Sequence, residues 1–355
     1  MRDLKLIMKF IFLELLYFSS NYTAAFKCFC FLVIFRFLFA AQALVKLPEN
    51  ATVPVVSTFG DSILDTGNND GSFWEGKPRG RYGNSKIPSD FIVEQFEIKQ
   101  LLPAYLDPDL HTNDLLTGVN FASSGAGYDP LTSKLVSAIS ISDQLEMFKI
   151  YIKEVRKLVG EKRIINITAN SPFIVAASSD DIANTYFLIH TGIFQYNVSA
   201  NTDLLVNSAS NFLQQLYGLG ARRIGVLGTP RLIGCLPSQR TLGGGEERKC
   251  AATYNQAAQL FNSKLSELIK NLNNRLPKGR MFYLDVYSPL NDMIQNPKKY
   301  GTGKFEVGFM CNQWSPFTCT NVSKYVFWDS FYPTEVAYKV IVNRVLRDFI
   351  NQIFY

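Results

Sequence analysis

Val53-Pro54-Val55-Val56-Ser57-Thr58-Phe59 is a short, largely β-branched run that ends at Gly60 and is followed at once by Asp61 and Ser62. An uninterrupted run of this length, closed by a glycine, is typical of a strand buried inside a sheet. The sequence therefore predicts a buried strand here, with a tight polar turn at its carboxyl end.

Four similar runs follow along the chain, and helical patterns separate them. We expect further strands at 119–122, 173–177, 223–227 and 281–286. Helices are expected at 144–158, capped by Ser142, and at 201–219, 247–272 and 333–354. Such alternation is typical of an α/β protein with a doubly wound, mostly parallel sheet between two helix layers. No repeat or linker divides the pattern, so a single three-layer α/β/α domain is predicted.

The amino-terminal 43 residues differ from the rest in composition. They carry five Lys or Arg against two Asp or Glu, and an apolar stretch over 28–45 is interrupted by Arg36. This stretch ends in Ala41-Gln42-Ala43, the small-x-small pattern that signal peptidase accepts. We therefore predict a signal peptide over residues 1–43 and a folded domain over residues 44–355.

Two alternatives to this cleavage remain open. Thr23-Ala24-Ala25 offers another set of small residues at which cleavage is possible. A retained membrane anchor would need ~20 apolar residues, and Arg36 near its centre would cost roughly 2.5–3.5 kcal/mol of insertion free energy. We therefore expect no stable membrane anchor in the mature protein.

Features downstream of the leader fit an extracellular, oxidising compartment. Four Asn-x-Ser/Thr sequons are candidate glycosylation sites: Asn50, Asn166, Asn197 and Asn321. Four cysteines also lie there, and four thiols allow three pairings. The pairing that closes two short local loops, Cys235–Cys250 with Cys311–Cys319, is the one we predict.

Composition and charge exclude several classes of protein. With 47% hydrophobic and 19% charged residues, the chain is neither disordered nor a coiled coil. The net charge of +6 falls to +3 once the +3 of the leader is removed, and no basic patch is concentrated enough for a nucleic acid. No Cys-x-x-Cys motif or histidine cluster is present, so we expect neither a metal nor a cofactor. No protein partner can be inferred.

Ser62 occupies the tight turn after the first predicted strand. Doubly wound sheets place their chemistry in the loops beyond the carboxyl ends of the strands. A serine held exposed in such a turn can act as a nucleophile. On these residues alone, a helix cap formed by Asp61 or Ser62 is the simpler interpretation. The wider sequence therefore has to decide between them.

Six segments, in order along the chain, favour chemistry at Ser62. They read FGDSILDTGNN at 59–69, GVNFASSGAG at 118–127, ASSDDI at 177–182, GARRI at 220–224, GCLPSQR at 234–240 and FWDSFYPTE at 327–335. Together they closely resemble the sequence blocks of plant GDSL esterase/lipases, members of the SGNH hydrolase superfamily, and are most similar to the extracellular lipase subgroup. The resemblance covers roughly residues 44–355. It implies an SGNH hydrolase-like fold and an acyl-ester or lipid substrate.

The resemblance implies a role for each matching residue. Ser62 would be the nucleophile, with its own backbone N–H in the oxyanion hole. A backbone donor near Gly125 and the side chain of Asp180 would add hydrogen bonds to the oxyanion. Asp329 would orient a catalytic histidine three residues later, and that histidine would take the proton from Ser62.

The sequence departs from this pattern at the base. The position three residues after Asp329 is Tyr332, and a tyrosine with a pKa of ~10 keeps its proton at neutral pH. The two histidines, His111 and His190, lie outside every matching segment. Asp180 stands where the family commonly has Asn, although the extracellular subgroup often carries Asp. An ionised carboxylate only accepts hydrogen bonds, so it cannot donate one to an oxyanion. We therefore expect hydrolysis by the triad route to be strongly impaired.

Three functions stand as hypotheses. The first is a secreted carboxylic-ester hydrolase that acts on acyl esters through Ser62 and is impaired by the loss of its base. The second is a catalytically degenerate protein that binds acyl ligands or contributes structurally to an extracellular coat. The third is an acyltransferase of the same fold, which would still need a base.

Overall fold

The computed structural model describes residue 47 and residues 53–69, 73–74, 77–78, 80–189, 196–230, 233–296 and 321–354. By its internal contacts the chain separates into two units, Met1–Lys46 and Leu47–Tyr355. Several sequence predictions lie outside the described residues: the signal peptide over 1–43, the sequon at Asn50, His190 and the pairing of Cys311 with Cys319.

Five buried strands form a parallel sheet at the centre of the second unit. They are β1 (Val56–Gly60), β4 (Gly118–Asn120), β5 (Pro172–Ala176), β6 (Arg223–Leu227) and β7 (Arg280–Leu284). Their order across the sheet is β4-β1-β5-β6-β7, and every neighbouring pair is parallel. A short antiparallel pair, β2 (Phe73–Trp74) and β3 (Lys77–Pro78), lies apart from this sheet. The five predicted strands are confirmed.

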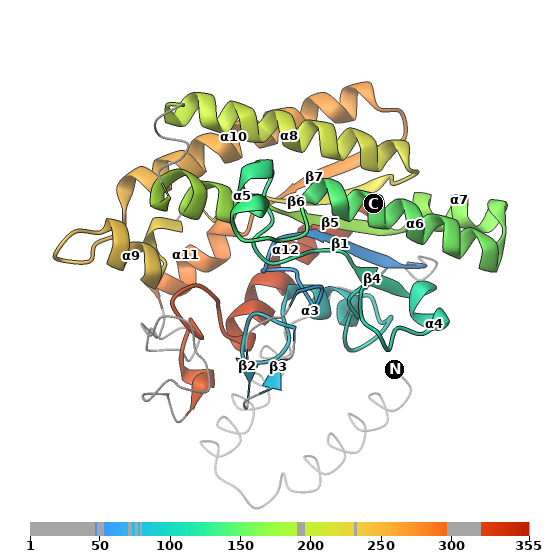
Figure 1. Cartoon of the computed structure of the whole chain (residues 1–355), viewed down its shortest axis with the longest axis horizontal. Coiled ribbons are helices and arrows are strands. Elements are labelled where there is room, and N and C mark those ends of the chain that lie inside the picture. The colour runs from blue at the N-terminus through green and yellow to red at the C-terminus, as the bar shows by residue number, and fades with distance from the viewer. Residues whose placement is uncertain are drawn as a thin grey trace, which may run out of the picture. The chain divides into compact units, whose positions relative to one another are not determined.

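Helices cover both faces of the parallel sheet (Figure 1). One layer contains α6 (Ile141–Val159), α7 (Glu161–Asn170), α8 (Val198–Gly218) and α10 (Ala252–Arg275). The opposite layer contains α3 (Pro88–Gln95), α11 (Tyr287–Gln295) and α12 (Glu335–Phe354). Shorter helices complete the fold: α4 (Thr112–Leu115), α5 (Pro130–Leu135), α9 (Pro237–Gly243), the π-helix η2 (Asp181–Leu188) and the 3₁₀ turns η3 (Ile233–Cys235) and η5 (Val322–Lys324). The predicted three-layer α/β/α domain is confirmed.

The core between the sheet and the first helix layer is strongly aromatic. Phe59 of β1 stacks on Phe121 with ring centroids 5.0 Å apart, and the edges of Phe148 and Phe212 meet it at 5.5 and 5.7 Å. All four rings are buried. Large rings bury much apolar surface each, so this cluster fixes β1 against α6 and α8.

Ser140, rather than Ser142, caps α6. Its Oγ accepts a hydrogen bond from the backbone N–H of Asp143, and the helix already begins at Ile141. The prediction of Ser142 was wrong because that residue lies inside the first turn. There its hydroxyl is 2.7 Å from the hydroxyl of Ser140.

The predicted Cys235–Cys250 disulfide is confirmed. It joins the end of η3 to the segment that precedes α10, and α9 lies within the loop that it closes. The backbone N–H of Ala251 also donates to the carbonyl of Gly234, 2.8 Å away. The disulfide therefore fastens α9 beside the start of α10.

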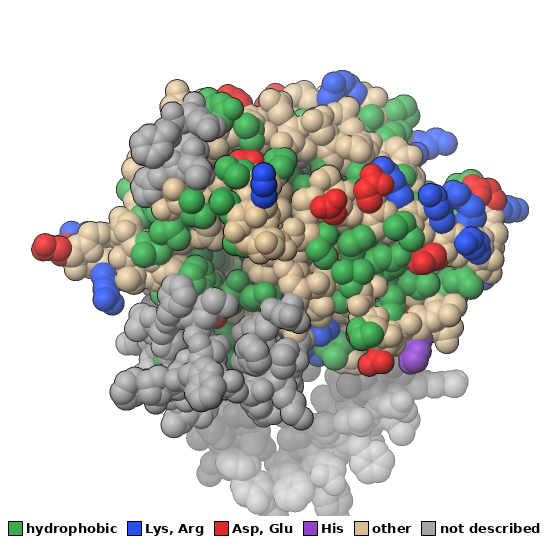
Figure 2. Space-filling model, in the orientation of Figure 1, with side chains coloured by type: hydrophobic (Ala, Val, Ile, Leu, Met, Phe, Trp, Pro, Cys, Tyr) green, Lys and Arg blue, Asp and Glu red, His purple; other side chains and the backbone are tan. Residues whose placement is uncertain are grey.

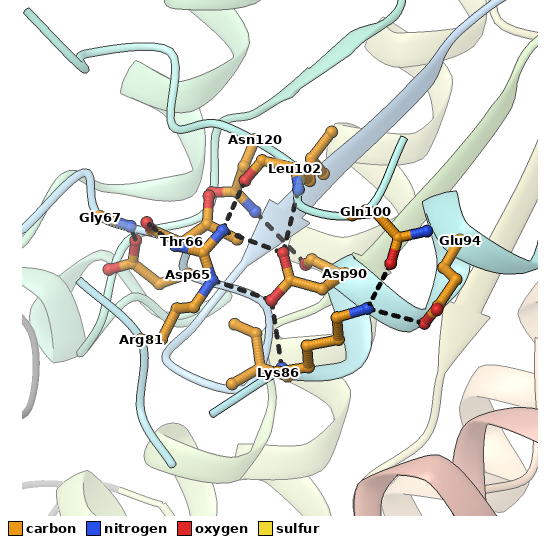
Figure 3. A network of polar contacts seen from close by, with 12 residues as sticks. Asp65, Thr66, Gly67, Arg81, Lys86, Asp90, Glu94, Gln100, Leu102 and Asn120 are labelled. Atoms are coloured by element: carbon orange, nitrogen blue, oxygen red, sulfur yellow. Dashed lines mark hydrogen bonds and ion pairs between the residues drawn. The ribbon is translucent and has the colours of Figure 1, made fainter. Parts of the chain in front are cut away.

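A buried ion pair ties α3 to the loop before it (Figure 3). Arg81 donates to both carboxylate oxygens of Asp90, at 2.8 and 2.9 Å, and Asp90 itself is fully buried. The same carboxylate accepts hydrogen bonds from the backbone N–H groups of Ile87 and Leu102. The guanidinium of Arg81 reaches the carbonyl of Leu102 as well. Every charged oxygen of Asp90 is thus compensated.

Arg81→Met is expected to lower the free energy of unfolding by about 3 kcal/mol, because it leaves the buried Asp90 carboxylate without its cation. Arg81 is 17% exposed, so the value lies at the lower end of the usual range. Lys149→Met is the matched control, since its ion pair with Glu146 is exposed and should contribute under about 0.5 kcal/mol. Urea denaturation of both variants tests this, and equal losses would contradict it.

Among the described helices, none has the length and apolar character needed to cross a bilayer. Hydrophobic side chains do gather on the outer surface between α6 and α4 (Figure 2). Ile150 of α6 is 49% exposed, and Leu106, in the segment before α4, is 51% exposed. Such partly exposed apolar residues are common on the surfaces of globular proteins.

Candidate active site

The carboxyl ends of β1 and β5 border the point at which the sheet changes direction. From β1 the chain passes to β4 on one side and later to β5 on the other. In doubly wound sheets, ligands bind in the crevice outside the strands at this switch point. Ser62 follows β1 by two residues, and Asp180 follows β5 by four. The fold thus brings two of the predicted site residues to one crevice.

Contacts from two other elements hold the turn that carries Ser62. Gly60 has a φ of +130°, and a Cβ there would lie 1.7 Å from the carbonyl of Ala176, so only glycine fits. The Asp61 N–H donates to that same carbonyl at 2.8 Å. The Gln144 side chain of α6 bonds both the N–H and the carbonyl of Gly60, at 2.8 and 2.9 Å. Within the described part of the chain, the Ser62 N–H has no hydrogen-bond partner.

Asp65 joins the Ser62 turn to the segment after β4. Its carboxylate accepts hydrogen bonds from the backbone N–H groups of Gly67, Asn68 and Ser124, at 2.8 to 2.9 Å. Asn68 donates in turn to the carbonyl and the side chain of Asn120. Burial raises the pKa of Asp65 to about 6, and the backbone hydrogen bonds oppose that rise. Sequence reasoning assigned no role to Asp65 or Asn68.

The backbone conformation and surroundings of Gly125 favour glycine at this position. Its φ is +80°, and a Cβ would lie 2.4 Å from the Cγ2 of Val136, so a larger residue would be strained. Its N–H bonds to none of the residues that the structure describes. Gly125 is not among the described residues that line the cavity next to Ser62. Its contribution to an oxyanion hole stays a prediction.

A cavity of about 130 Å³ opens beside Ser62. Ser62, Asp180 and Tyr332 stand together in its wall, although they come from three distant segments of the chain. The rest of the wall is mostly apolar. The structure therefore groups the predicted nucleophile Ser62 with the carboxyl group of Asp180 and with Tyr332, which occupies the base position.

The carboxyl group of Asp180 lies close enough to that of Asp61 for the two to interact. Asn184, one turn further along η2, donates to the Oδ1 of Asp180 at 2.6 Å. Burial raises the pKa of Asp180 to about 6, and this hydrogen bond lowers it. Asp61 is 1% exposed, and burial followed by the charge of Asp180 raises its pKa well above the usual value. Burial thus shifts two carboxyl groups near Ser62 toward the protonated form.

Asp181 supports the loop after β4. Its carboxylate accepts hydrogen bonds from the N–H groups of Tyr128 and Asp129, at 2.8 and 3.2 Å, and from the Thr132 hydroxyl at 2.6 Å. Burial raises its pKa to about 8 in spite of these bonds. A Cβ on Gly127 would lie 2.0 Å from Asp181 Oδ1, so glycine is what permits the approach.

Asp329 fixes the turn that carries Tyr332. It is 1% exposed, and its Oδ1 accepts hydrogen bonds from the backbone N–H groups of Phe331 and Tyr332, both at 2.8 Å. The Trp328 N–H donates to the carbonyl of Tyr332 at 2.8 Å and closes the turn. The backbone at position 332 is thereby held beside Ser62.

The Tyr332 hydroxyl interacts with the Ser62 side chain but cannot act as a base at neutral pH. Burial, and then the charge of Asp180, raise the pKa of Tyr332 well above its usual value, while the hydrogen bond with Ser62 lowers it. The phenol therefore keeps its proton and does not take one from Ser62. Its ring lies 5.2 Å from that of Tyr82, centroid to centroid.

His111, the one histidine among the described residues, is not part of the candidate site. It is exposed at the N-cap of α4, where its backbone N–H donates to Asp114. It does not line the cavity. It lies on the surface of the molecule. Within the described ranges, no group of three or more His, Cys, Asp or Glu is arranged to hold a metal ion.

Three of the four sequons lie in the described part of the chain. Asn166 is on α7, Asn197 is the N-cap of α8, and Asn321 precedes η5. All three are exposed. Their positions permit glycan attachment, which stays a prediction.

Comparison with known proteins identifies the family. The family model for GDSL-like Lipase/Acylhydrolase matches residues 56–345. The chain belongs to this family. GDSL esterase/lipase EXL3 of Arabidopsis thaliana is 47% identical over 340 residues, which cover 89% of this chain and 93% of the relative. GDSL esterase/lipase EXL2 of the same plant is 40% identical over 370 residues, covering 94% and 97%. The family resemblance identified in the sequence is confirmed, and with it the class of ester-bond hydrolases.

Solved structures with a similar fold are distant in sequence. A catalytic mutant of Axe2, an acetylxylan esterase from Geobacillus stearothermophilus, aligns at 12% identity with a TM-score of 0.42. That alignment covers 85% of this chain and 96% of the esterase. LAE5, an alpha/beta hydrolase from the metagenome of Lake Arreo in Spain, aligns at 10% identity with a TM-score of 0.40, covering 85% and 97%.

Proposed function

We propose that this GDSL hydrolase is a secreted protein that takes acyl esters at Ser62, and that its hydrolysis is impaired because Tyr332 occupies the position of the base. The observation that carries the proposal is the pairing of Ser62 with Tyr332 in one cavity wall. The leader over residues 1–43 and the exposed sequons support secretion.

The geometry supplies most of what acyl transfer needs. Ser62 Oγ would attack the ester carbonyl and form a tetrahedral oxyanion. The Ser62 N–H, which has no partner in the described chain, would donate to that oxyanion. The Gly125 N–H and a protonated Asp180 would be the further donors, as the family resemblance implies.

The missing step is removal of the serine proton. A general base contributes roughly 10²–10⁴-fold to such reactions, and it must bind a proton near neutral pH. Tyr332 holds its own proton, because its pKa is raised. The Oδ1 of Asp329 accepts hydrogen bonds from the backbone of its own turn and so holds Tyr332 in place. Impaired turnover follows from the proton that Tyr332 keeps.

A second candidate function rests on the same tyrosine. A protein that keeps the acyl cavity and loses the base would bind acyl ligands without turning them over. Such a chain would act as a ligand-binding or structural component of an extracellular coat. This candidate gains support if ester binding is found with no hydrolysis above the uncatalysed rate.

Ser62→Ala is expected to change the hydrolysis of para-nitrophenyl hexanoate by less than about tenfold. The reason is that a triad acts as a unit: in subtilisin, loss of the serine, of the histidine or of the whole triad costs about the same. The residual rate of the native chain should be ~10³–10⁴-fold over water at most. Steady-state kinetics of the secreted native protein and the variant provide the measurement. A loss of ~10³-fold or more in Ser62→Ala would show that another group serves as base.

A further inference from the structure

The cavity beside Ser62 extends into the second helix layer of the fold. Alternate residues of β5 point to opposite faces of the sheet. Phe173 and Val175 enter the core with α6 and α8, while Ile174 and Ala176 line the cavity on the other face. Opposite them stand Ile341, Val342 and Val345 of α12. The cavity therefore lies between the sheet and α12.

Its depth follows from the spacing of the residues in its two walls. On β5 the wall runs from Ala177 back to Ile174, which is ~10 Å at about 3.3 Å per residue. On α12 it runs from Tyr338 to Val345, again ~10 Å at about 1.5 Å per residue. Both walls thus give the same depth behind the carboxyl edge of the sheet.

Polarity changes along this depth. The mouth holds Ser62, Asp180 and Tyr332, together with two buried polar atoms that lack a hydrogen-bond partner in the described structure, the Tyr338 hydroxyl and Gln239 Oε1. Buried polar atoms of this kind usually bind a ligand or water. Beyond Ala176 on β5 and Tyr338 on α12, the described lining of these two walls is apolar: Ile174, Ile341, Val342 and Val345. A ligand with a polar head and an alkyl tail matches this gradient.

The size of the cavity limits the tail. Its volume of about 130 Å³ is close to that of an apolar cavity of ~150 Å³ that binds benzene. An alkyl group of about six carbons therefore fills it. Longer chains would have to displace the side chains of α12, which pack against the sheet.

We infer that this cavity is the acyl-chain site, and that Ile341, Val342 and Val345 of α12 set a preference for acyl groups of about six carbons. The inference rests on the proposed action of Ser62 on acyl esters, since it places the ester carbonyl at the mouth. It adds the position of the chain and the residues that limit its length.

Binding of methyl alkyl ketones to the native full-length protein tests the inference without turnover. A ketone keeps the ester carbonyl and has no leaving group. Each methylene that enters the cavity should tighten binding about fourfold, so methyl pentyl ketone should bind about 60-fold more tightly than ethyl methyl ketone. Methyl nonyl ketone should gain nothing further. Isothermal titration calorimetry gives the dissociation constants, and a steady gain up to the nonyl ketone would overturn the inference.

Variants of α12 locate the site. Val342→Phe should fill the deep end and weaken methyl pentyl ketone at least tenfold, with ethyl methyl ketone little changed. Ile341→Ala should enlarge it and move the preferred ketone to longer chains. Val340→Phe is the matched control, because Val340 lies on the same helix and does not line the cavity. Equal effects of Val342→Phe and Val340→Phe in folded proteins would overturn the inference.

Failure of the two proposals can be told apart. If ketone binding follows chain length and responds to Val342→Phe, the acyl site stands even when no Ser62-dependent hydrolysis is found. If the native protein hydrolyses acyl esters slowly, with a loss of less than about tenfold in Ser62→Ala, but shows no chain-length optimum, the proposed function stands and the acyl site is wrong. Thermal unfolding of each variant shows whether it has folded.

Discussion

Tyr332→His is expected to raise kcat/KM for para-nitrophenyl hexanoate by about 10²–10⁴-fold at pH 8, the contribution of a positioned general base. At this pH an imidazole is neutral and can take the proton of Ser62. The backbone at position 332 is already fixed by Asp329 and lies beside the serine, so the new side chain needs no rearrangement of the loop. Steady-state kinetics of native and variant protein give the ratio.

Two further variants identify the cause of the gain. Tyr332→Phe removes the phenol hydroxyl without adding a base, and its rate should stay within about threefold of the native rate. Ser62→Ala in the Tyr332→His background should abolish the gain, because the histidine then has no nucleophile to activate. If Phe and His raise the rate equally, the hydroxyl of Tyr332 obstructs the serine and the absence of a base is not the cause.

The parallel sheet was predictable because its strands are short, apolar and bounded by turn residues. The run at β5, for example, is buried at every position and needs no long-range information to be recognised. The cap of α6 was harder, since Ser140 and Ser142 lie within one turn and both suit an N-cap. Only the hydrogen bond from Asp143 N–H distinguishes them.

The site was predictable only where its residues stand in sequence blocks. Ser62, Asp180 and Tyr332 were identified in this way, and the fold brings them to one cavity. Gln144 was missed because its contact with Gly60 spans 84 positions and nothing in its helical surroundings marks it. The raised pKa of Asp61 was also beyond sequence reasoning, since it depends on burial and on the carboxyl group of Asp180, which follows β5.

The protonation state of Asp180 decides whether it can donate a hydrogen bond to the oxyanion. With a pKa of about 6, it is mostly protonated at pH 5 and mostly ionised at pH 8. A protonated carboxyl can donate a hydrogen bond to an oxyanion, whereas an ionised one repels it. The site therefore loses a donor over the same pH range in which a histidine at position 332 would gain its ability to act as a base.

Asp180→Asn in the Tyr332→His background is therefore expected to raise kcat/KM by about 10²-fold at pH 8 and by much less at pH 5. An amide donates at every pH, and its oxygen can still accept the hydrogen bond from Asn184. The ratio of the two rates, measured from pH 5 to pH 8, is the readout. Asp109→Asn, an exposed change of the same kind, is the control and should leave the ratio at one.

Stability supplies an independent check on the same carboxyl group. The pKa of Asp180 is higher in the folded state than its usual value of ~3.9, so the folded protein binds this proton more tightly than the unfolded chain does. Its contribution is fully present below that usual value and is lost as the pH rises through about 6. Relative to the native protein, Asp180→Asn should then have a more favourable free energy of unfolding at pH 8 than it has at pH 5. If the variant gains neither stability nor rate at pH 8, Asp180 is not the group that limits the oxyanion site.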